Sequence, residues 1–213
     1  MPSARIVGTG AYVPERVLTN ADIEKLVDTS DEWIVTRTGI SERHIAADDQ
    51  ATSDLAYPAA RAALEAAGLD PIDLDMILVA TAPPDMFFPS TACVLQDRLG
   101  ARRAGGLDIS AACSGFVYGM ALGDSLIRAG TMRTVLLLGA ETLTKVVNWQ
   151  DRNTCVLFGD GAGAVVLRAD EGERGVLSTH LYADGSKGPL LILPGGGSRH
   201  PVSHALVDSG LAK

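Results

Sequence analysis

The sequence predicts an α/β fold in which helices cover both faces of a mostly parallel sheet. Three observations predict this fold class. Stretches typical of strands alternate along the chain with stretches typical of helices. The strand stretches, such as 76–81 and 134–139, are continuous apolar runs, which is the pattern of strands buried on both faces. The helical stretches are followed by glycines at 68, 100 and 130, which suit the left-handed conformation at a helix end.

The first expected elements are a strand and a short helix. The strand is expected at residues 5–12. Thr29 and Glu32 stand three residues apart, which is the spacing of a capping box. This pair predicts that a helix carrying Trp33 begins here.

The middle of the chain predicts two further helices around an apolar strand. Ser53 is expected to cap a helix that ends at Gly68, after which a strand occupies 76–81. Ser90 is expected to cap the following helix, which ends at Gly100.

The remaining elements continue the alternation. A helix is expected at 114–129. Strands are expected at 106–110, 134–139, 155–158, 162–167 and 175–182. The tail from 195 onward is rich in glycine and poor in large apolar residues, which predicts a loop.

Composition excludes several classes of protein. Of the 213 residues, 46% are hydrophobic and 21% are charged, which is an ordinary globular balance. No apolar run approaches the ~18 residues that a membrane-spanning helix needs, and the first five residues lack the apolar core of a signal peptide. We therefore expect a cytoplasmic protein that does not associate with membranes. The net charge of −8 disfavours nucleic-acid binding, which depends on dense lysine and arginine.

The cysteines and histidines predict no metal site. The three cysteines are Cys93, Cys113 and Cys155, and neither they nor the four histidines have the spacing of a zinc motif. Free thiols in a reducing compartment are expected. Cys93 and Cys155 lie in apolar surroundings, and for both we expect packing in the core.

Cys113 has a different setting, because it lies where a short strand ends and a helix begins. Small residues surround it in the segment 107–116, so the chain can turn sharply and a substrate can approach. The amide groups of a helix start carry partial positive charge, which favours a thiolate and can stabilise an oxyanion. This pattern indicates a nucleophile for acyl transfer. The alternative is a buried structural cysteine, which the local pattern alone leaves open.

Two glycine motifs suggest nucleotide binding only weakly. Gly8 and Gly10 would begin a dinucleotide fingerprint, but Val13 stands where a third glycine is needed. The glycines spaced two apart from 159 to 163 could cradle a phosphate. We favour a tight turn and close backbone packing for them.

The segment 111–116 resembles the active-cysteine motif of β-ketoacyl-acyl carrier protein synthase III, a family of the thiolase-like superfamily. The similarity extends from Ile6 to about Leu193. Further blocks agree in the same order, at 29–34, 37–40, 42–44, 88–93, 158–164 and 180–186.

The resemblance implies a thiolase-like layered αβα fold, which consists of two similar halves. Residues 1–193 correspond to the amino-terminal half, and 194–213 are expected to be a glycine-rich loop or the truncated start of the second half. The family's catalytic histidine and asparagine lie in that second half. Its Pro-His-Gln-Ala-Asn block does not occur between Cys113 and Lys213, so the second half is expected to be missing from this chain.

The resemblance also implies a reaction of type II fatty-acid synthesis. Cys113 would take the acyl group of an acyl-coenzyme A, usually acetyl-coenzyme A. Decarboxylation of malonyl-acyl carrier protein would then supply the carbanion that attacks the acyl-cysteine. The implied partners are acyl carrier protein, acyl-coenzyme A and a second copy of the chain in a homodimer. Coenzyme A thioester is the substrate, and no permanently bound cofactor is implied.

The binding residues carry over position by position from the family. Trp33 and Arg152 match the pair that stacks on the adenine of coenzyme A, Arg37 matches a phosphate contact, and Thr29 matches a residue near the adenine. Phe88 matches a residue that reaches the acyl pocket of the other subunit. Without the resemblance, Trp33 and Phe88 would be interpreted as packing residues and the arginines as surface charges.

Two other functions remain open. The chain could be a catalytically silent fragment that at most binds coenzyme A or associates with an intact subunit. It could also be a related thiolase-like condensing enzyme with another acceptor. The acyl chain length is not predicted.

Overall fold

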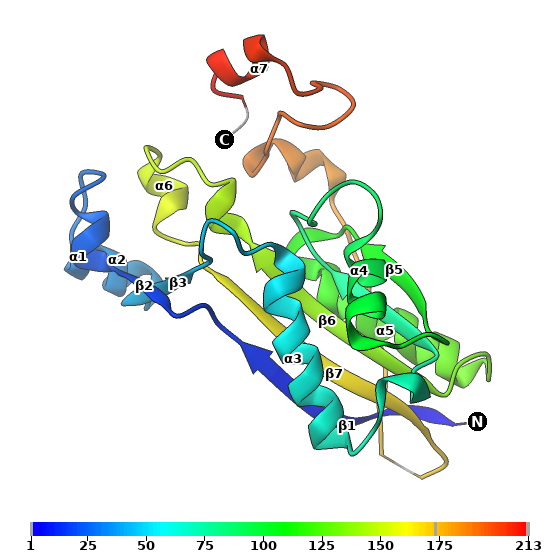
Figure 1. Ribbon diagram of the computed structural model, residues 1–213. Coiled ribbons are helices and arrows are strands. Elements are labelled where there is room, and N and C mark those ends of the chain that lie inside the picture. Colours follow the sequence, from blue (N-terminus) through cyan, green and yellow to red (C-terminus); the bar gives the residue numbers. More distant parts are fainter. Residues whose placement is uncertain (1, 173, 212–213) are drawn as a thin grey trace. The chain divides into compact units, whose positions relative to one another are not determined.

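The computed structural model describes residues 2–172 and 174–211, which form two compact units (Figure 1). Each unit is assembled from segments that are separated in the sequence. The first unit contains the segments up to Val17, His44–Thr142 and Gly159–His180, and the second contains Leu18–Arg43, Leu143–Phe158 and the chain from Leu181 onward.

A five-stranded sheet forms the centre of the first unit. Its strand order is β1 (Ser3–Tyr12), β7 (Asp160–Asp170), β6 (Thr134–Thr142), β4 (Met76–Ala80) and β5 (Gly105–Ile109). Strand β4 is parallel to β5 and β6, whereas β7 is antiparallel to both β6 and β1. Four of these strands therefore run in one direction, as the sequence predicted, but the reversed β7 in their midst makes the sheet mixed.

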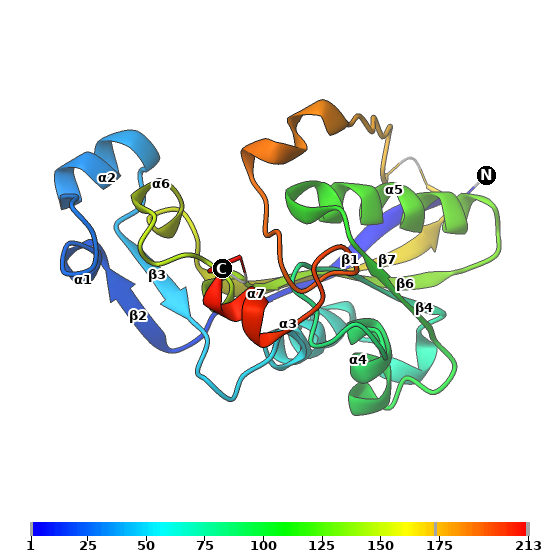
Figure 2. The same cartoon turned by 90° about the horizontal axis from the view of Figure 1, so that it is seen from above.

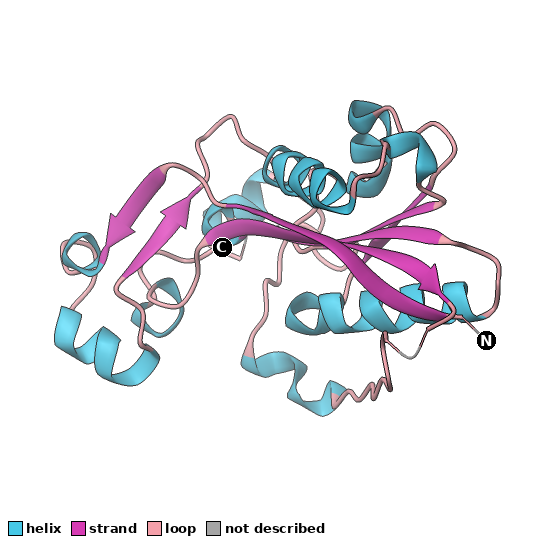
Figure 3. Cartoon of the chain, turned by 90° about the horizontal axis from the view of Figure 1, so that it is seen from below, coloured by secondary structure: helices cyan, strands magenta, loops and turns pink. Residues whose placement is uncertain are grey.

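Helices cover both faces of this sheet. Helices α3 (Thr52–Ala67) and α4 (Thr91–Leu99) lie on one face, and α5 (Gly115–Arg128) lies on the other (Figures 2 and 3). The apolar side chains form one core on each face. This arrangement confirms the layered αβα fold.

The alternation of side chains in β6 shows why its sequence is apolar throughout. Leu136 and Leu138 belong to the core shared with α3 and α4, whereas Val135 and Leu137 belong to the core shared with α5. All four side chains are fully buried. A strand covered on both faces needs apolar residues at every position, and this is what the continuous run predicted.

Gly8 and Gly10 allow β1 to approach the backbone of α3. A Cβ atom at Gly8 would lie 2.3 Å from the carbonyl oxygen of Ala63, and one at Gly10 would lie 2.2 Å from that of Ala59. The two glycines are therefore needed for helix–sheet packing and do not form a dinucleotide motif. The expectation for the glycines at 161 and 163 was wrong. Both lie inside β7, and no atom crowds a Cβ at Gly163.

The second unit is built from short elements around its own apolar cluster. It contains α1 (Asn20–Ile23), α2 (Asp31–Thr38), α6 (Arg152–Cys155) and α7 (His204–Asp208). It also contains Leu18 and Thr19 of β2 (Arg16–Thr19) and Glu42 and Arg43 of β3 (Glu42–Ile45), two strands that pair with each other. The buried members of the cluster are Ile23, Ile34, Val147, Cys155 and Val156. Short 3₁₀ turns complete the described structure, at η1 (Pro71–Asp73), η2 (Ala112–Ser114), η3 (Leu143–Lys145) and η4 (Gly185–Leu190).

Some helix ends were predicted correctly and others were displaced. Ser90 caps α4 by accepting a hydrogen bond from the Cys93 N–H, and Gly100 ends that helix with φ 74°. Helix α3 begins before the predicted cap Ser53, since Ala51 is its N-cap. The capping residue of α2 is Ser30 and not Thr29, because the Ser30 side chain accepts a hydrogen bond from the Trp33 N–H.

Two predicted strands are wrong. The strand expected at 155–158 is replaced by the end of α6, a short helix that begins where the Asp151 side chain accepts a hydrogen bond from the Asn153 N–H. Residues 175–182 contain no strand. Both stretches are apolar enough for a strand. Val176 donates one backbone hydrogen bond to the Ala4 carbonyl oxygen of β1, but neither stretch is assigned as a strand.

The boundary predicted near residue 193 stays a prediction. Within the tail, the short helix α7 interrupts the expected loop. In the part of the chain that the structure describes, no helix is both long enough and apolar enough to cross a bilayer.

Candidate active site

Cys113 lies at the point where the chain passes from β5 into α5. Strand β5 ends at Ile109, and Cys113 is the middle residue of η2, directly before α5. The cysteine is exposed, so the alternative of a buried structural cysteine does not fit. Its neighbour Ala112 has φ 44°, a left-handed conformation that costs a non-glycine residue about 1 kcal/mol. The backbone is therefore sharply bent directly before the thiol.

A row of glycines brings α5 close to the sheet. A Cβ atom at Gly115 would lie 2.9 Å from the Ala80 Cβ, and one at Gly119 would lie 2.3 Å from a methyl group of Leu137. Gly123 repeats the pattern one turn further along, against Leu167. These residues are four apart and so lie on one face of the helix. They fix the start of α5, and with it Cys113, at the end of β4.

Phe88 lies in the loop between β4 and α4. Its side chain is 84% exposed, so core packing does not account for it. Ala80, the last residue of β4, pairs with Ile109, the last residue of β5. Because the two strands are parallel and end together, the loops that carry Phe88 and Cys113 leave the sheet at the same edge.

Glu141 is a titratable residue at this edge that sequence reasoning missed. A Cβ atom at Gly139 of β6 would lie 3.5 Å from the Phe116 ring in the first turn of α5. Glu141 is two residues further along β6 and therefore points to the same face of the sheet. Burial raises the pKa of its carboxyl group to about 7. The available signal was a charged residue at the end of the apolar run 134–140.

In the second unit, three predicted binding residues form one cluster around an indole ring. The guanidinium carbon of Arg37 lies 4.8 Å from the centre of the Trp33 ring, and that of Arg152 lies 5.0 Å from it. Arg152 also donates a hydrogen bond to the Asp28 carbonyl oxygen, with an N–O distance of 3.0 Å. We call Trp33, Arg37 and Arg152 the stacking cluster. A ring flanked by cations suits a purine that carries phosphate groups.

Thr29 precedes this cluster in the chain. Its hydroxyl oxygen is buried and has no hydrogen-bond partner among residues 2–172 and 174–211. An unpaired buried hydroxyl is costly. It is therefore a group that a ligand could satisfy.

The predicted site residues thus belong to two groups. Cys113 and Phe88 lie in the first unit, together with Glu141, whereas Thr29, Trp33, Arg37 and Arg152 lie in the second.

The other two cysteines have different surroundings from each other. Cys93 is exposed, so the expectation that it packs in the core was wrong. Cys155 is fully buried, as expected, and burial raises the pKa of its thiol. No group of three potential metal ligands occurs within the described ranges.

Comparison with known proteins identifies similar sequences and structures. The family model of 3-oxoacyl-[acyl-carrier-protein] synthase III matches residues 107–185. The chain is 59% identical over 209 residues to the β-ketoacyl-[acyl-carrier-protein] synthase III of Caldanaerobacter subterraneus. The matched region covers 98% of this chain and 63% of the relative.

Solved structures agree with this result. The 3-oxoacyl-[acyl-carrier-protein] synthase III of Aquifex aeolicus superimposes with a TM-score of 0.84 at 53% identity, over 86% of this chain and 59% of that one. The 3-oxoacyl-(acyl carrier protein) synthase III of Pseudomonas aeruginosa gives a TM-score of 0.87 at 44% identity. The match covers 95% of this chain and 62% of that one. The chain spans about three fifths of the length of these relatives.

Proposed function

Since this chain belongs to the β-ketoacyl-[acyl-carrier-protein] synthase III family by sequence and fold, we propose that the protein containing it is an acyl-thioester condensing enzyme whose nucleophile is Cys113. The single observation that supports this proposal best is the position of the exposed thiol. It precedes a helix that a row of glycines holds against the sheet.

The first step is acyl transfer to sulfur. The Cys113 sulfur attacks the thioester carbonyl of an acyl-coenzyme A, the carbonyl π electrons move to oxygen, and the bond to the coenzyme A sulfur then breaks. Coenzyme A leaves as the thiol, with the proton that the cysteine has lost. The amide groups at the start of α5 favour negative charge at this point, both on the sulfur and on the developing oxyanion.

The second step is carbon–carbon bond formation. Malonyl-acyl carrier protein loses carbon dioxide, and the resulting carbanion attacks the acyl-cysteine and releases Cys113. The product is a 3-oxoacyl-acyl carrier protein, so we propose acetyl-coenzyme A and malonyl-acyl carrier protein as the substrates. The family's histidine and asparagine block is not found between Cys113 and Lys213, so this step needs residues that the chain does not supply.

The stacking cluster is the proposed site for the nucleotide end of coenzyme A. The indole ring of Trp33 offers a flat surface to adenine, Arg152 offers a cation for stacking, and Arg37 offers one for phosphate. The unpaired hydroxyl of Thr29 supplies a hydrogen bond. Coenzyme A is a substrate in this proposal, not a resident cofactor.

The proposal includes a homodimer in the cytoplasm. Adjacent exposed apolar side chains mark a surface that contacts a partner, and Phe87 beside Phe88 is also exposed. The 84% exposure of Phe88 is therefore consistent with a side chain that reaches the acyl pocket of a second subunit.

Intact-mass measurement after incubation with acetyl-coenzyme A tests the nucleophile. The full-length protein should gain one acetyl group, and the Cys113→Ala variant should gain none. Cys93→Ala is the matched control, because Cys93 is also exposed but does not precede α5, and it should still be acetylated. An acetyl adduct that persists in Cys113→Ala would refute the role of Cys113.

A condensation assay distinguishes the alternatives. A 3-oxoacyl product with malonyl-acyl carrier protein supports the proposed enzyme. The absence of both an acetyl adduct and a condensation product with malonyl-acyl carrier protein favours the catalytically silent alternative. A product formed only with a different acceptor favours a related condensing enzyme.

A further inference from the structure

The second unit, which contains the stacking cluster, also contains two buried polar residues. Asn20, the first residue of α1, is 2% exposed, and Arg43, in β3, is 5% exposed. The Arg43 guanidinium donates a hydrogen bond to the Asn20 side-chain oxygen, with an N–O distance of 2.9 Å. The two side chains therefore form one buried unit, which we call the Asn20–Arg43 pair.

Arg43 connects this pair to the element that carries Arg152. Its second terminal nitrogen donates to the carbonyl oxygen of Val156 at 3.0 Å. Val156 is the C-cap of α6, and Arg152 is the first residue of that helix. Arg43 also donates to the Leu18 carbonyl oxygen at 3.3 Å, which joins β2 to the same network.

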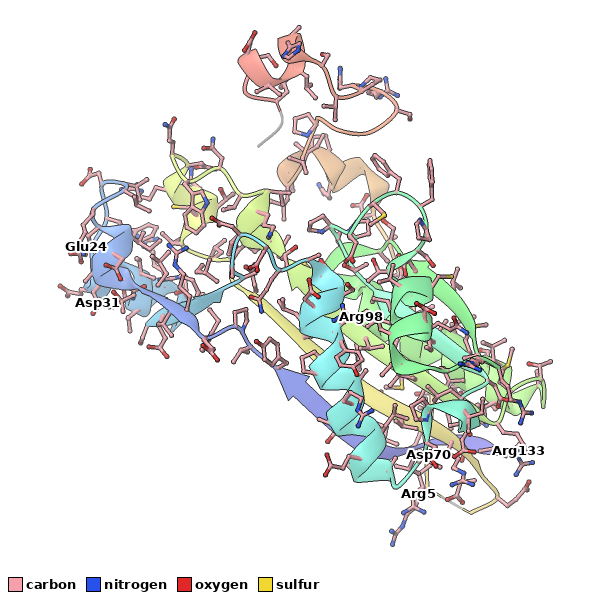
Figure 4. The ribbon with its side chains drawn as sticks, in the orientation of Figure 1. Arg5, Glu24, Asp31, Asp70, Arg98 and Arg133 are labelled. Carbon is pink, nitrogen blue, oxygen red and sulfur yellow. The ribbon has the colours of Figure 1, made fainter. Side chains whose placement is uncertain are left out.

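Asn20 connects the pair to both ends of the helix that carries Trp33 and Arg37. Its amide nitrogen donates to the Asp31 carboxylate and to the Ile40 carbonyl oxygen, each at 2.8 Å. Asp31 begins α2, and Ile40 directly follows its C-cap Gly39. Figure 4 labels Asp31 beside Glu24, whose carboxylate accepts a hydrogen bond from the Asp31 N–H at 2.7 Å.

A continuous hydrogen-bonded path therefore runs from α6 through the Asn20–Arg43 pair to α2. These two helices supply all three members of the stacking cluster. We propose that the Asn20–Arg43 pair positions the stacking cluster and thereby controls affinity for the adenine end of coenzyme A. The proposal rests on the coenzyme A site proposed above.

The energetics of Arg43 support a positioning role. No carboxylate lies within ion-pair distance of it in the described part of the chain, and its Nε–H is buried without a partner. Burial lowers the pKa of its guanidinium group. A buried cation without a counter-ion is an expensive means of stabilisation compared with an apolar side chain. What this group provides is directional hydrogen bonding to three elements at once, β2, α1 and the end of α6.

The test compares two acyl donors in the full-length protein. Acetyl-coenzyme A carries adenine, whereas acetyl-pantetheine carries the same thioester without the nucleotide. In Arg43→Lys and Asn20→Ser, the KM for acetyl-coenzyme A should rise about tenfold. The KM for acetyl-pantetheine and the kcat with either donor should stay within about twofold. Loss of structural stability alone would change the results for both donors.

A double-mutant cycle and a matched control sharpen the test. In a Trp33→Ala background, Arg43→Lys should cause no further rise in the KM for acetyl-coenzyme A, because the ring that Arg43 helps to position is already absent. Arg98→Lys is the control. The Arg98 guanidinium lies 4.9 Å from the Tyr57 ring centre and donates to Asp54 in the first unit, where Figure 4 labels it near α3. This variant should leave the ratio of the two KM values unchanged.

The outcomes separate the two proposals. If the unmodified protein does not prefer acetyl-coenzyme A to acetyl-pantetheine, the proposed coenzyme A site fails. If it does prefer acetyl-coenzyme A, and folded Arg43→Lys and Asn20→Ser keep that preference, the positioning role fails. If circular dichroism shows that one variant does not fold, the other variant tests the positioning role, through its ratio of the KM for acetyl-coenzyme A to the KM for acetyl-pantetheine.

Discussion

At the scale of single residues, sequence blocks predicted which side chains matter but not how they contact one another. Trp33, Arg37 and Arg152 were carried over singly from the family, and the structure brings all three together around one ring. Arg43 stood in a block that matched the family, but no sequence pattern indicated that its side chain is buried. Glu141 was missed for the same reason, because its environment depends on α5 folding over β6. Sequence gives residue identity, whereas burial follows from tertiary packing.

Trp33 supplies the first prediction at this scale. Trp33→Ala removes the surface on which adenine is proposed to stack, so the KM for acetyl-coenzyme A should rise by about ten- to a hundredfold, with a smaller change in kcat. Steady-state kinetics with acetyl-coenzyme A measures this effect. Trp149→Phe is the control, because its indole N–H donates to the Thr144 carbonyl oxygen and the change keeps an aromatic ring there. A Trp33→Ala enzyme with an unchanged KM would contradict the prediction.

Glu141 supplies a prediction about pH and stability. Burial raises its pKa from the ordinary value of 4.5 to about 7. The folded state therefore holds this proton at pH values where the unfolded state has lost it. Ionisation of Glu141 therefore lowers the free energy of unfolding. The stability that depends on the neutral carboxyl group is fully present below pH 4.5 and is lost as pH rises through 7.

Glu141→Gln tests that contribution, since glutamine is uncharged at every pH. At pH 8 the variant should be more stable than the unmodified protein by on the order of 1 to 2 kcal/mol, allowing for solvent screening at a partly exposed group. The difference should shrink as pH falls toward 4.5. Urea unfolding at several pH values measures it, and a difference that does not depend on pH would exclude titration of Glu141 as the cause.

At the scale of elements, prediction succeeded where local chemistry determines the structure. Ser90 and Gly100 bound α4 as predicted, because a cap and a left-handed glycine act within one turn. The strand predicted at 155–158 was wrong because its apolar residues pack into the core of the second unit from the end of a helix as well as they would from a strand. Strand formation depends on a partner strand, which the local sequence does not specify.

Gly8 provides a prediction at this scale. Gly8→Ala would place a methyl group 2.3 Å from the backbone oxygen of Ala63, which cannot rotate away as a side chain can. The free energy of unfolding should fall by about 2 to 4 kcal/mol. Gly163→Ala is the matched control, since it also lies in a strand of this sheet but has no atom within 4 Å of the added carbon. It should change stability by less than about 0.5 kcal/mol in the same denaturation assay.

At the scale of the whole molecule, alternating elements predicted the α/β class and the layers but not the mixed sheet. Strand β7 is reversed relative to its neighbours β1 and β6. Its apolar run looks like those of the parallel strands, so direction could not be inferred from composition. The division into two units was equally hidden, because each unit takes segments from several parts of the chain.

Exposed apolar side chains lead to a prediction about association. Phe87 and Phe88 are 78% and 84% exposed, and four consecutive apolar residues from Leu190 to Leu193 are exposed as well. Exposed apolar groups of this size favour contact with another protein surface. We expect the 213-residue chain to self-associate at micromolar concentrations, as measured by light scattering after size-exclusion chromatography. A monodisperse monomer would contradict this expectation.

The stacking cluster also affects how quickly a ligand arrives. The chain has a net charge of −8, which repels polyanions in general. Two guanidinium groups within about 5 Å of one ring centre offer a phosphate two positive charges on that acidic background. A phosphate-bearing ligand would be drawn to these charges and turned so that its charged end approaches first. Added salt would then slow its capture while hardly changing its rate of escape.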